Sequence, residues 1–372
     1  MEELERANLF IVPLDDERHW YRYHHLFAQV LRGRLVSGTS PNLLARLHRR
    51  ASSWFEQQGL IVEAVQHALA GHDWERAAGL LEAYGRWLMV RGQVHAVLGW
   101  LTALPEEVVC ARPPLLINHA TALICVNQLE AAEDRLQAAE EVLAAHRPDE
   151  RSRTILGYAT VLRASIARYR GDHIRCLSLS RQTLEVLPAT DVPVRTSTNV
   201  NIAWACLMSG DVAPANERLL MGAVATAHKL GELLTYIRGM IMLADLQRGQ
   251  GRLSQAAATY REAARAVLEP EMLRVLPNAA AYYFGLGDLL REWNDLDRAA
   301  DLLAQGQEMV RAMLLVEADT ILAGYIALAW LHQSHGDSAT ALATLREVEA
   351  LARAASRPIY ARVQWQLART WR

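Results

Sequence analysis

The fold is decided by a short pattern, seen most clearly in the stretch GRLSQAAATYREAARAV, residues 251–267. Gly251 can take the left-handed backbone conformation that ends a preceding helix. Ala256 leaves room for two helices to approach closely, and Tyr260 and Ala264 follow it at helical spacing. The stretch therefore predicts a helix end, a tight turn and a second helix that packs against the first.

The same pattern occurs seven times along the chain. Each copy has a Gly, Asn or His at a helix end, then in most copies an Asp that can accept hydrogen bonds from the next helix. The turn residues are His72, Asn127, Gly171, Gly210, Gly251, Asn294 and Gly336. The small residues five positions later are Ala77, Ala132, Cys176, Ala215, Ala256, Ala299 and Ala341. From Asn127 onward the copies lie 39 to 44 residues apart, which predicts an all-α superhelical solenoid of TPR-like helix pairs.

Composition and charge fit a soluble helical protein without nucleic-acid or membrane affinity of its own. The formal net charge is -2, so the chain as a whole does not attract a polyanion. The four cysteines are far apart, form no CxxC pair, and read as small buried hydrophobes in a reducing compartment. No signal peptide and no run long enough to cross a bilayer is found, so we expect a cytoplasmic protein.

The first residues do not follow the repeat. Residues 10–14 and 20–23 are typical of two strands around an acidic turn, and a helix is predicted from His24 to Leu35. Because an isolated two-stranded hairpin is marginal in water, we expect its supporting elements to lie upstream of Met1. We therefore predict a remnant of another domain in residues 1–38 and the α-solenoid in residues 39–372.

No catalytic constellation can be named in this sequence. HExxH, GxSxG, a phosphate-binding loop and the dinucleotide glycine pattern are all missing, so we predict no enzymatic activity, metal site or cofactor in this chain. His67 lies on an apolar helix with Ala64 and Ala68, and this setting favours a structural histidine over a ligand or a general base.

Aromatic, amide and arginine side chains gather on the first helices of the later repeats. In helix-pair solenoids these helices usually line the concave binding surface. A small polar inducer such as a sugar could stack on such residues and hydrogen-bond with them. The alternative is that Trp204 and the tyrosines fill gaps between repeats. The candidates are Asn199, Asn201 and Trp204, then Tyr236 and Arg238, then Asn278, Tyr282 and Tyr283.

Two stretches resemble a known family, the MalT-like transcription regulators. Residues 8–16 with 20–27 are similar to the end of that family's winged-helix domain. A second stretch, which includes Trp54, His67 and Trp100, is similar to the start of its superhelical sensor domain. Together these motifs cover roughly the first third of the chain, and the later repeats match only in general style.

The resemblance implies the function of a sensor. In that family an N-terminal module binds ATP, the superhelix senses an inducer, and a C-terminal LuxR-type domain binds DNA. This sequence has neither end module, so the resemblance implies ATP and DNA for the parent protein only. We therefore expect a fragment, or a naturally truncated gene product, that binds a small inducer or a regulatory protein and couples it to the absent ATPase and DNA-binding domains.

Two other interpretations stay open. One is a free-standing TPR-like scaffold for protein–protein interaction, which would dock partners in its groove without any inducer. The other concerns the end of the chain, where Trp365 and Trp371 lie in a predicted helix from Ile359 to Trp371. Apolar surface there favours self-association or a further repeat.

Overall fold

The computed structural model describes residues 11–13, 21–145, 149–211, 213–266, 279–312 and 318–354. Apart from one short hairpin these residues are helical or lie in the turns between helices, which confirms the all-α solenoid. The chain divides into two compact units. Unit 1 comprises residues 1–84 and 102–108, and unit 2 comprises residues 85–101 and 109–372.

Unit 1 begins with the predicted hairpin, in which Ile11 lies opposite Tyr23 in an antiparallel pair of strands. The strands are β1 (Ile11–Pro13) and β2 (Tyr21–Tyr23), and the helices that follow are α2 (His25–Gly38), α3 (Pro41–Gln57) and α4 (Ile61–Ala70). Short helix α7 (Glu106–Cys110) begins in this unit, whereas α5 (Trp74–Val90) and α6 (Val94–Ala103) contain residues of both units. The expected hairpin and the helix after it are confirmed.

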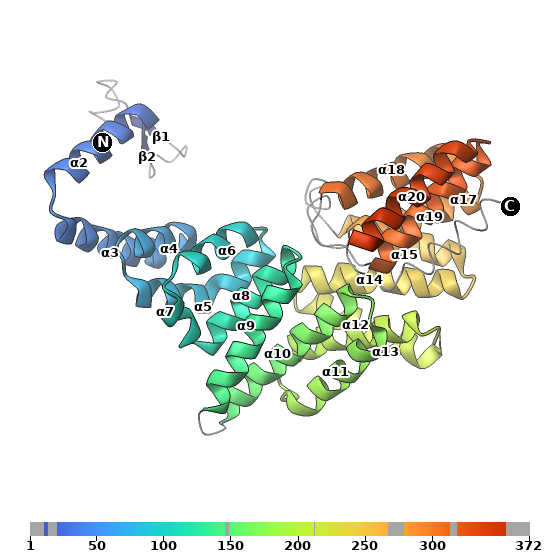
Figure 1. The fold of residues 1–372 in the computed structure, drawn as a ribbon, viewed down its shortest axis with the longest axis horizontal. Coiled ribbons are helices and arrows are strands. Elements are labelled where there is room, and N and C mark those ends of the chain that lie inside the picture. The colour runs from blue at the N-terminus through green and yellow to red at the C-terminus, as the bar shows by residue number, and fades with distance from the viewer. Residues whose placement is uncertain are drawn as a thin grey trace. The chain divides into compact units, whose positions relative to one another are not determined.

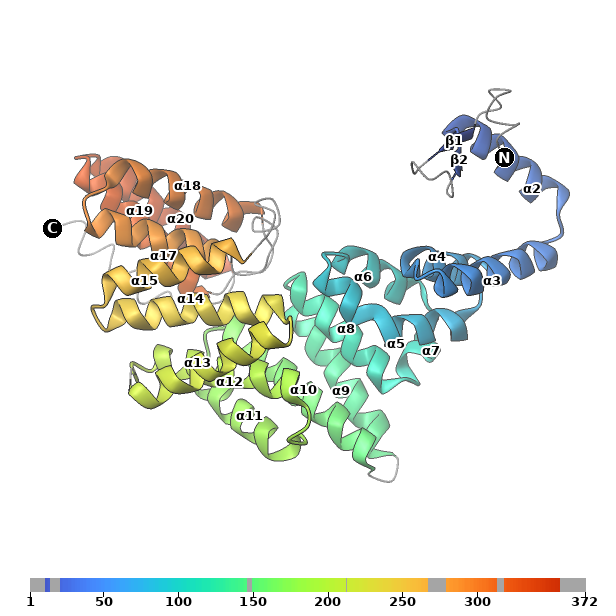
Figure 2. The same ribbon diagram turned by 180° about the vertical axis from the view of Figure 1, so that it is seen from behind.

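Unit 2 is a succession of helix pairs, drawn from teal to red in Figures 1 and 2. The first helices are α8 (Pro113–Cys125), α10 (Glu150–Tyr169), α12 (Val192–Met208), α14 (Leu233–Gly249), α17 (Ala279–Glu292) and α19 (Ala318–Ser334). The second helices are α9 (Leu129–Ala144), α11 (His173–Val186), α13 (Pro214–Lys229), α15 (Leu253–Arg265), α18 (Leu296–Ala312) and α20 (Ser338–Ala354). Each first helix packs on its own second helix, and each from α8 to α17 also packs on the first helix of the next pair.

The turns between paired helices have the predicted geometry. Every one of the seven turn residues has a positive φ, from +49° at His72 to +81° at Gly210. At one of them the N–H of Asp172 donates to the carbonyl of Ala167 at 2.8 Å, which satisfies a carbonyl at the helix end. The Asp172 carboxylate then accepts a hydrogen bond from the N–H of Arg175 at 2.9 Å and so caps the second helix.

The small residue of the pattern is fully buried in six of the seven copies, as predicted, but Ala215 is exposed. The expected close contact at Ala215 is therefore wrong. Helix α13 begins at Pro214, four residues after Gly210, whereas α15 begins at Leu253, two residues after Gly251. The longer turn delays the helix, so α13 buries residues further along, including Leu220.

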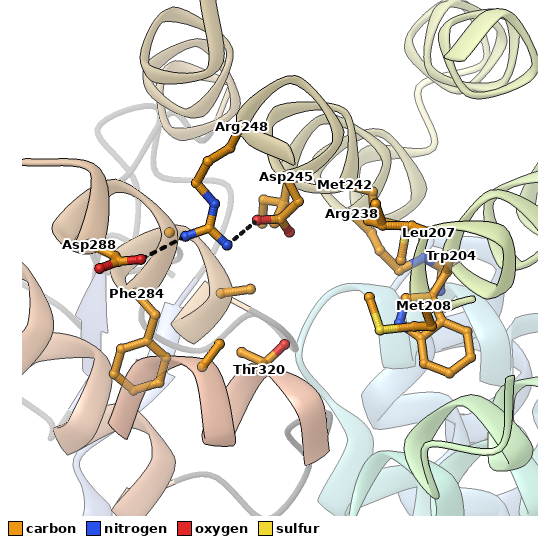
Figure 3. Close-up of a pocket in the computed structure, with 14 residues that line it drawn as sticks. Trp204, Leu207, Met208, Arg238, Met242, Asp245, Arg248, Phe284, Asp288 and Thr320 are labelled. Atoms are coloured by element: carbon orange, nitrogen blue, oxygen red, sulfur yellow. Dashed lines mark hydrogen bonds and ion pairs between the residues drawn. The ribbon is translucent and has the colours of Figure 1, made fainter. Parts of the chain in front are cut away.

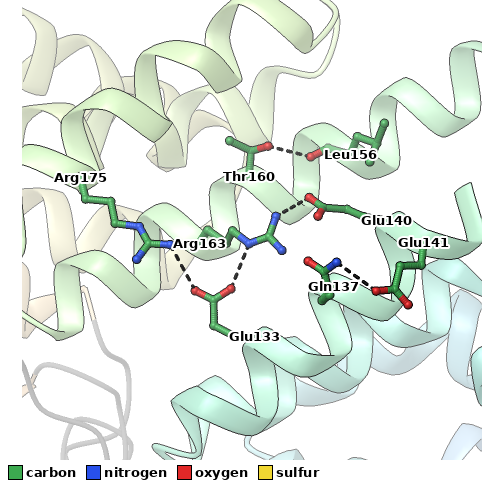
Figure 4. A network of polar contacts seen from close by, with 8 residues as sticks. All are labelled: Glu133, Gln137, Glu140, Glu141, Leu156, Thr160, Arg163 and Arg175. Carbon is green, nitrogen blue, oxygen red and sulfur yellow. Dashed lines mark hydrogen bonds and ion pairs between the residues drawn. The ribbon is translucent and has the colours of Figure 1, made fainter. Parts of the chain in front are cut away.

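Successive pairs of unit 2 are also joined by charged groups (Figure 4). Arg163 of α10 donates to Glu133 of α9 at 2.9 Å, and its guanidinium also donates to Glu140. Arg175 of α11 approaches the same Glu133 at 3.9 Å. Because the Arg163 side chain is only 17% exposed, these charge-assisted bonds fix the second helix of one pair against the next pair.

Candidate ligand-binding site

A pocket of about 230 Å³ opens on the first helices of four consecutive pairs in unit 2 (Figure 3). All of its lining residues lie on α12, α14, α17 and α19. They are Trp204, Leu207, Met208, Arg238, Ile241, Met242, Asp245, Arg248, Ala281, Phe284, Gly285, Asp288, Thr320 and Ala323. A ligand in this pocket would contact side chains from several repeats at once.

One part of the pocket wall is apolar. Trp204 and Phe284 are almost fully buried, at 2% and 3% exposure, so their rings form a fixed part of the wall. Met208 and Met242 add flexible, polarisable side chains. Apolar walls with a few placed polar groups are the usual make-up of small-molecule sites.

A second part of the wall is a chain of charged groups between α14 and α17. Figure 3 shows Arg248 reaching between two carboxylates, those of Asp245 at 3.5 Å and Asp288 at 3.0 Å. Asp288 also receives a hydrogen bond from Arg291 Nε at 2.9 Å. Arg291 also lies 3.8 Å from the Glu292 carboxylate, so each arginine of this network has at least one carboxylate partner.

The environment of this network changes its proton affinities. The phenolic hydroxyl of Tyr260 donates to Asp245 Oδ1 at 2.5 Å. Burial raises the pKa of Asp245, and the charge of Arg248 and the Tyr260 bond only partly oppose this rise. Burial opposes the charge on Arg248, but Asp245, Tyr260 and Asp288 together raise its pKa. Both side chains are half-buried, so the pair is held by mutual attraction in a site that is only partly shielded from water.

Arg238 is the other arginine of the lining, and it has a different environment. Its Nη2 donates to the hydroxyl of Ser197 at 2.9 Å, and its buried Nε has no hydrogen-bond partner. Burial and the like charge of Arg168 lower the pKa of Arg238 to about 10, so the side chain still carries its proton at neutral pH. Figure 3 places Arg238 on the α12 side of the pocket, apart from the Arg248 ion pairs.

Two of the eight residues proposed from the sequence, Trp204 and Arg238, line this pocket. Asn199 and Asn201 lie on the same helix as Trp204 but not in the lining; Asn199 is half-buried and Asn201 is fully buried. The Asn201 amide has no hydrogen-bond partner for either Oδ1 or Nδ2. Asn278 falls outside the described residues.

The three tyrosines among the proposed residues pack against other rings instead of lining the pocket. The Tyr236 ring lies 5.0 Å from the His228 ring, measured between centroids. Tyr282 contacts Tyr283 edge to face at 5.0 Å and Tyr260 at 6.5 Å. Such ring contacts are what the alternative interpretation expects, in which the tyrosines fill gaps between helices.

Sequence reasoning missed the charged residues Asp245, Arg248 and Asp288. One signal was present, because Asp245 and Arg248 stand three residues apart in a helix whose other residues are mostly buried. Charges in such a helix need partners, and an i, i+3 pair supplies one of them. The second partner, Asp288, lies 40 residues further along the chain and could be found only from the packing of α14 on α17.

In the described part of the chain, no group of three or more metal-binding side chains lies together. In the same residues, no helix is long and apolar enough to cross a membrane. His67 makes a 2.8 Å hydrogen bond to His48 through their Nδ1 atoms and stacks on Phe55, which suits a structural role.

Comparison with known protein families gives two matches to this chain. The family model of the MalT-like TPR region matches residues 157–372. The model of the MalT winged helix domain matches residues 1–44. Where the winged-helix remnant ends and the solenoid begins, placed at residues 38 and 39 from the sequence, stays a prediction.

Curated relatives are much longer than this chain. The HTH-type transcriptional regulator MalT of Cronobacter sakazakii is 27% identical over 300 residues, which cover 80% of this chain and 32% of that protein. MalT of Klebsiella pneumoniae is 26% identical over 318 residues, covering 83% of this chain and 34% of that protein. The serine/threonine-protein kinase PknK of Mycobacterium tuberculosis is 36% identical over 165 residues, which cover 44% of this chain and 15% of the kinase.

Solved structures share the fold at low sequence identity. A signal transduction ATPase with a tetratricopeptide repeat sensor from Pyrococcus horikoshii aligns with a TM-score of 0.53 and 12% identity, over 99% of this chain and 54% of that one. The Cut9–Hcn1 assembly aligns with a TM-score of 0.50 and 15% identity, over 92% of this chain and 70% of that one. Both support the tetratricopeptide-like fold and nothing finer.

Proposed function

Because this chain belongs to the family of MalT-like TPR regions, we propose that it is the signal-sensing part of a larger transcription regulator. In this proposal unit 2 binds a small inducer, or a regulatory protein, and passes the signal to other domains of the parent protein. The single observation that carries the proposal is the pocket lined only by the first helices α12, α14, α17 and α19.

The placement of this pocket suits coupling. A ligand that touches several consecutive first helices favours the repeat arrangement in which all its contacts are made. If the ligand binds one arrangement better than another, it shifts the population toward the first by its difference in binding free energy. The resulting change in the repeats can then alter contacts made elsewhere in the parent protein.

The relatives support a sensing role over catalysis. This chain is similar in sequence to part of a transcriptional regulator and to part of a kinase, and the match covers only 15% of the kinase. A repeat region shared by two such different proteins suits recognition, not either protein's own activity. ATP and DNA binding are accordingly assigned, in this proposal, to other domains of the parent protein, and this chain holds no cofactor.

The proposal is tested by thermal unfolding of the chain with a panel of sugars, nucleotides, amino acids and organic acids. A ligand that binds only the native state raises the Tm by mass action. We expect at least one compound to raise it. Ala323 lines the pocket but is exposed, so Ala323→Phe should block the pocket, remove that shift, and leave the Tm of the free protein unchanged.

Ala258→Phe is the matched control, because Ala258 is equally an exposed alanine but lies on the second helix α15. The control should respond to the ligand as the wild type does. A shift that survives in Ala323→Phe would place the binding site elsewhere. No shift with any compound would contradict a small inducer and favour a protein partner, as in the scaffold interpretation.

A further inference from the structure

The charges that line the pocket are unequally paired. Arg248 is balanced within the chain of Asp245, Asp288 and Arg291. Arg238 makes no ion pair with any carboxylate among the residues that the structure describes; the one hydrogen bond found for it goes to the neutral hydroxyl of Ser197. Among the described residues, this guanidinium of the pocket wall therefore has a positive charge without a counter-charge.

The surroundings of Arg238 make that charge costly. Its Nε is buried without a partner, and Arg168 adds a second positive charge nearby. Arg168 is itself almost fully buried, at 1% exposure, with its guanidinium 4.3 Å from the ring centre of Tyr169. A charge kept from water normally has an ion of opposite sign beside it. No such ion lies beside Arg238 among the described residues, and Arg238 is one of the residues that line the pocket.

Other features of the pocket limit what such an anion could be. The volume of about 230 Å³ equals that of about eight water molecules, so the part of a ligand that lies inside the pocket has on the order of ten non-hydrogen atoms. Trp204, Met208 and Phe284 offer an apolar wall to the rest of the molecule. A planar guanidinium with two or more free N–H groups matches the oxygens of a carboxylate or a phosphate.

We infer that the pocket takes a small amphipathic anion, with one carboxylate or phosphate group on Arg238 and an apolar body against Trp204, Met208 and Phe284. This inference rests on the proposed sensing function and narrows it to a ligand class. Arg248 lines another part of the pocket and is already paired with Asp245 and Asp288, so it offers no second unpaired cation to the ligand.

The test compares matched compounds on the full 372-residue chain. Each aromatic or aliphatic acid of the panel, such as phenylpropionate, is paired with its neutral amide, here phenylpropionamide. A phosphate of similar size, here phenyl phosphate, separates the two anion types. Affinity is measured by calorimetric titration. We expect one or more of the anions to bind, and its neutral counterpart to bind about 10- to 100-fold more weakly, as expected for loss of a charged hydrogen bond.

Three variants assign that difference to a residue. Arg238→Gln should lose the preference for the anion over the amide, whereas Arg238→Lys should keep part of it through its charge. Arg218→Gln is the matched control, because Arg218 is exposed on α13 and does not line the pocket. The free Arg238→Gln protein should melt no lower than the wild type, since an uncompensated charge has been removed.

The outcomes separate the two proposals. Neutral compounds that bind as tightly as their acids, unaffected by Arg238→Gln, would overturn the anionic class while the sensing pocket stands. Anion binding that persists in Arg238→Gln would also overturn it. If no compound binds, charged or neutral, both the ligand class and the small-inducer function are contradicted.

Discussion

Arg248 of α14 donates a hydrogen bond to Asp288 of α17 at 3.0 Å and so joins two consecutive repeats beside the pocket. The same arginine lies 3.5 Å from Asp245 on its own helix. The wall of the pocket is therefore also part of the interface between repeats. In the proposed function, a ligand that disturbs these groups would act directly on the packing of α14 against α17.

Asp288→Asn should destabilise unit 2. The change removes the negative charge that faces Arg248 and Arg291. Because the Asp288 side chain is only 14% exposed, water cannot easily take over the ion pairs that the two arginines lose. We expect a loss of about 1–3 kcal/mol in the free energy of unfolding, measured with denaturant. Asp301→Asn, at an exposed position of α18, should change it little; equal effects of the two variants would contradict a structural role for Asp288.

Gly324→Ala should destabilise the packing of α17 against α19. A Cβ at Gly324 would overlap the ring of Phe284, which is buried between neighbouring repeats. Overpacking of this kind costs about 1–3 kcal/mol. Gly222→Ala on α13 is the opposite case, because nothing lies within 4 Å of the added methyl. That variant should gain about 0.4–1 kcal/mol from the stiffer unfolded chain, so the two alanines should shift the Tm in opposite directions.

Asn201→Leu should not destabilise the protein, although Asn201 is fully buried. Neither polar atom of its amide has a hydrogen-bond partner, so the native state carries the cost of two buried polar groups without bonds. Leucine has a similar size and no such groups. We expect a gain of about 1–3 kcal/mol in denaturant unfolding. A clear loss would mean that the amide has a partner in solution.

Asp337→Ala should lower the Tm at neutral pH but not in acid. The carboxylate of Asp337 accepts hydrogen bonds from the backbone N–H of Thr340 at 2.9 Å and from its hydroxyl at 2.6 Å. These bonds hold the pKa of Asp337 below its usual value. The cap is therefore fully formed above the ordinary carboxyl pKa of about 3.9 and is lost as the pH falls through the lower, folded-state pKa. A difference in Tm between variant and wild type that stays constant from pH 7 to pH 3 would refute this role.

Much of the fold could be predicted because its determinants are local. The left-handed conformation at Asn127, Gly171 and Gly336 follows from residue type and from the helix end alone. Ala215 shows where local reasoning fails. The turn after Gly210 is longer than its counterparts, and Pro214 fixes the start of α13 later than the repeat pattern indicates.

The candidate site was less predictable because it depends on contacts between repeats. Trp204 and Arg238 could be proposed from their place on first helices. Which polar residues on those helices have partners, and which do not, is set by neighbours some 40 residues away, such as Ser197 for Arg238. The tyrosine ring of Tyr282 could stack on a ligand by residue type alone, yet in the structure it packs on the rings of Tyr260 and Tyr283.

The central claim is that a ligand binds on the first helices of four consecutive repeats, and amide hydrogen exchange tests it most directly. The chain would be exchanged with and without the compound that raises its Tm most. We predict that added protection concentrates in α12, α14, α17 and α19, and that Ala323→Phe abolishes it. Protection confined to unit 1, or to second helices such as α13 and α15, would contradict the claim.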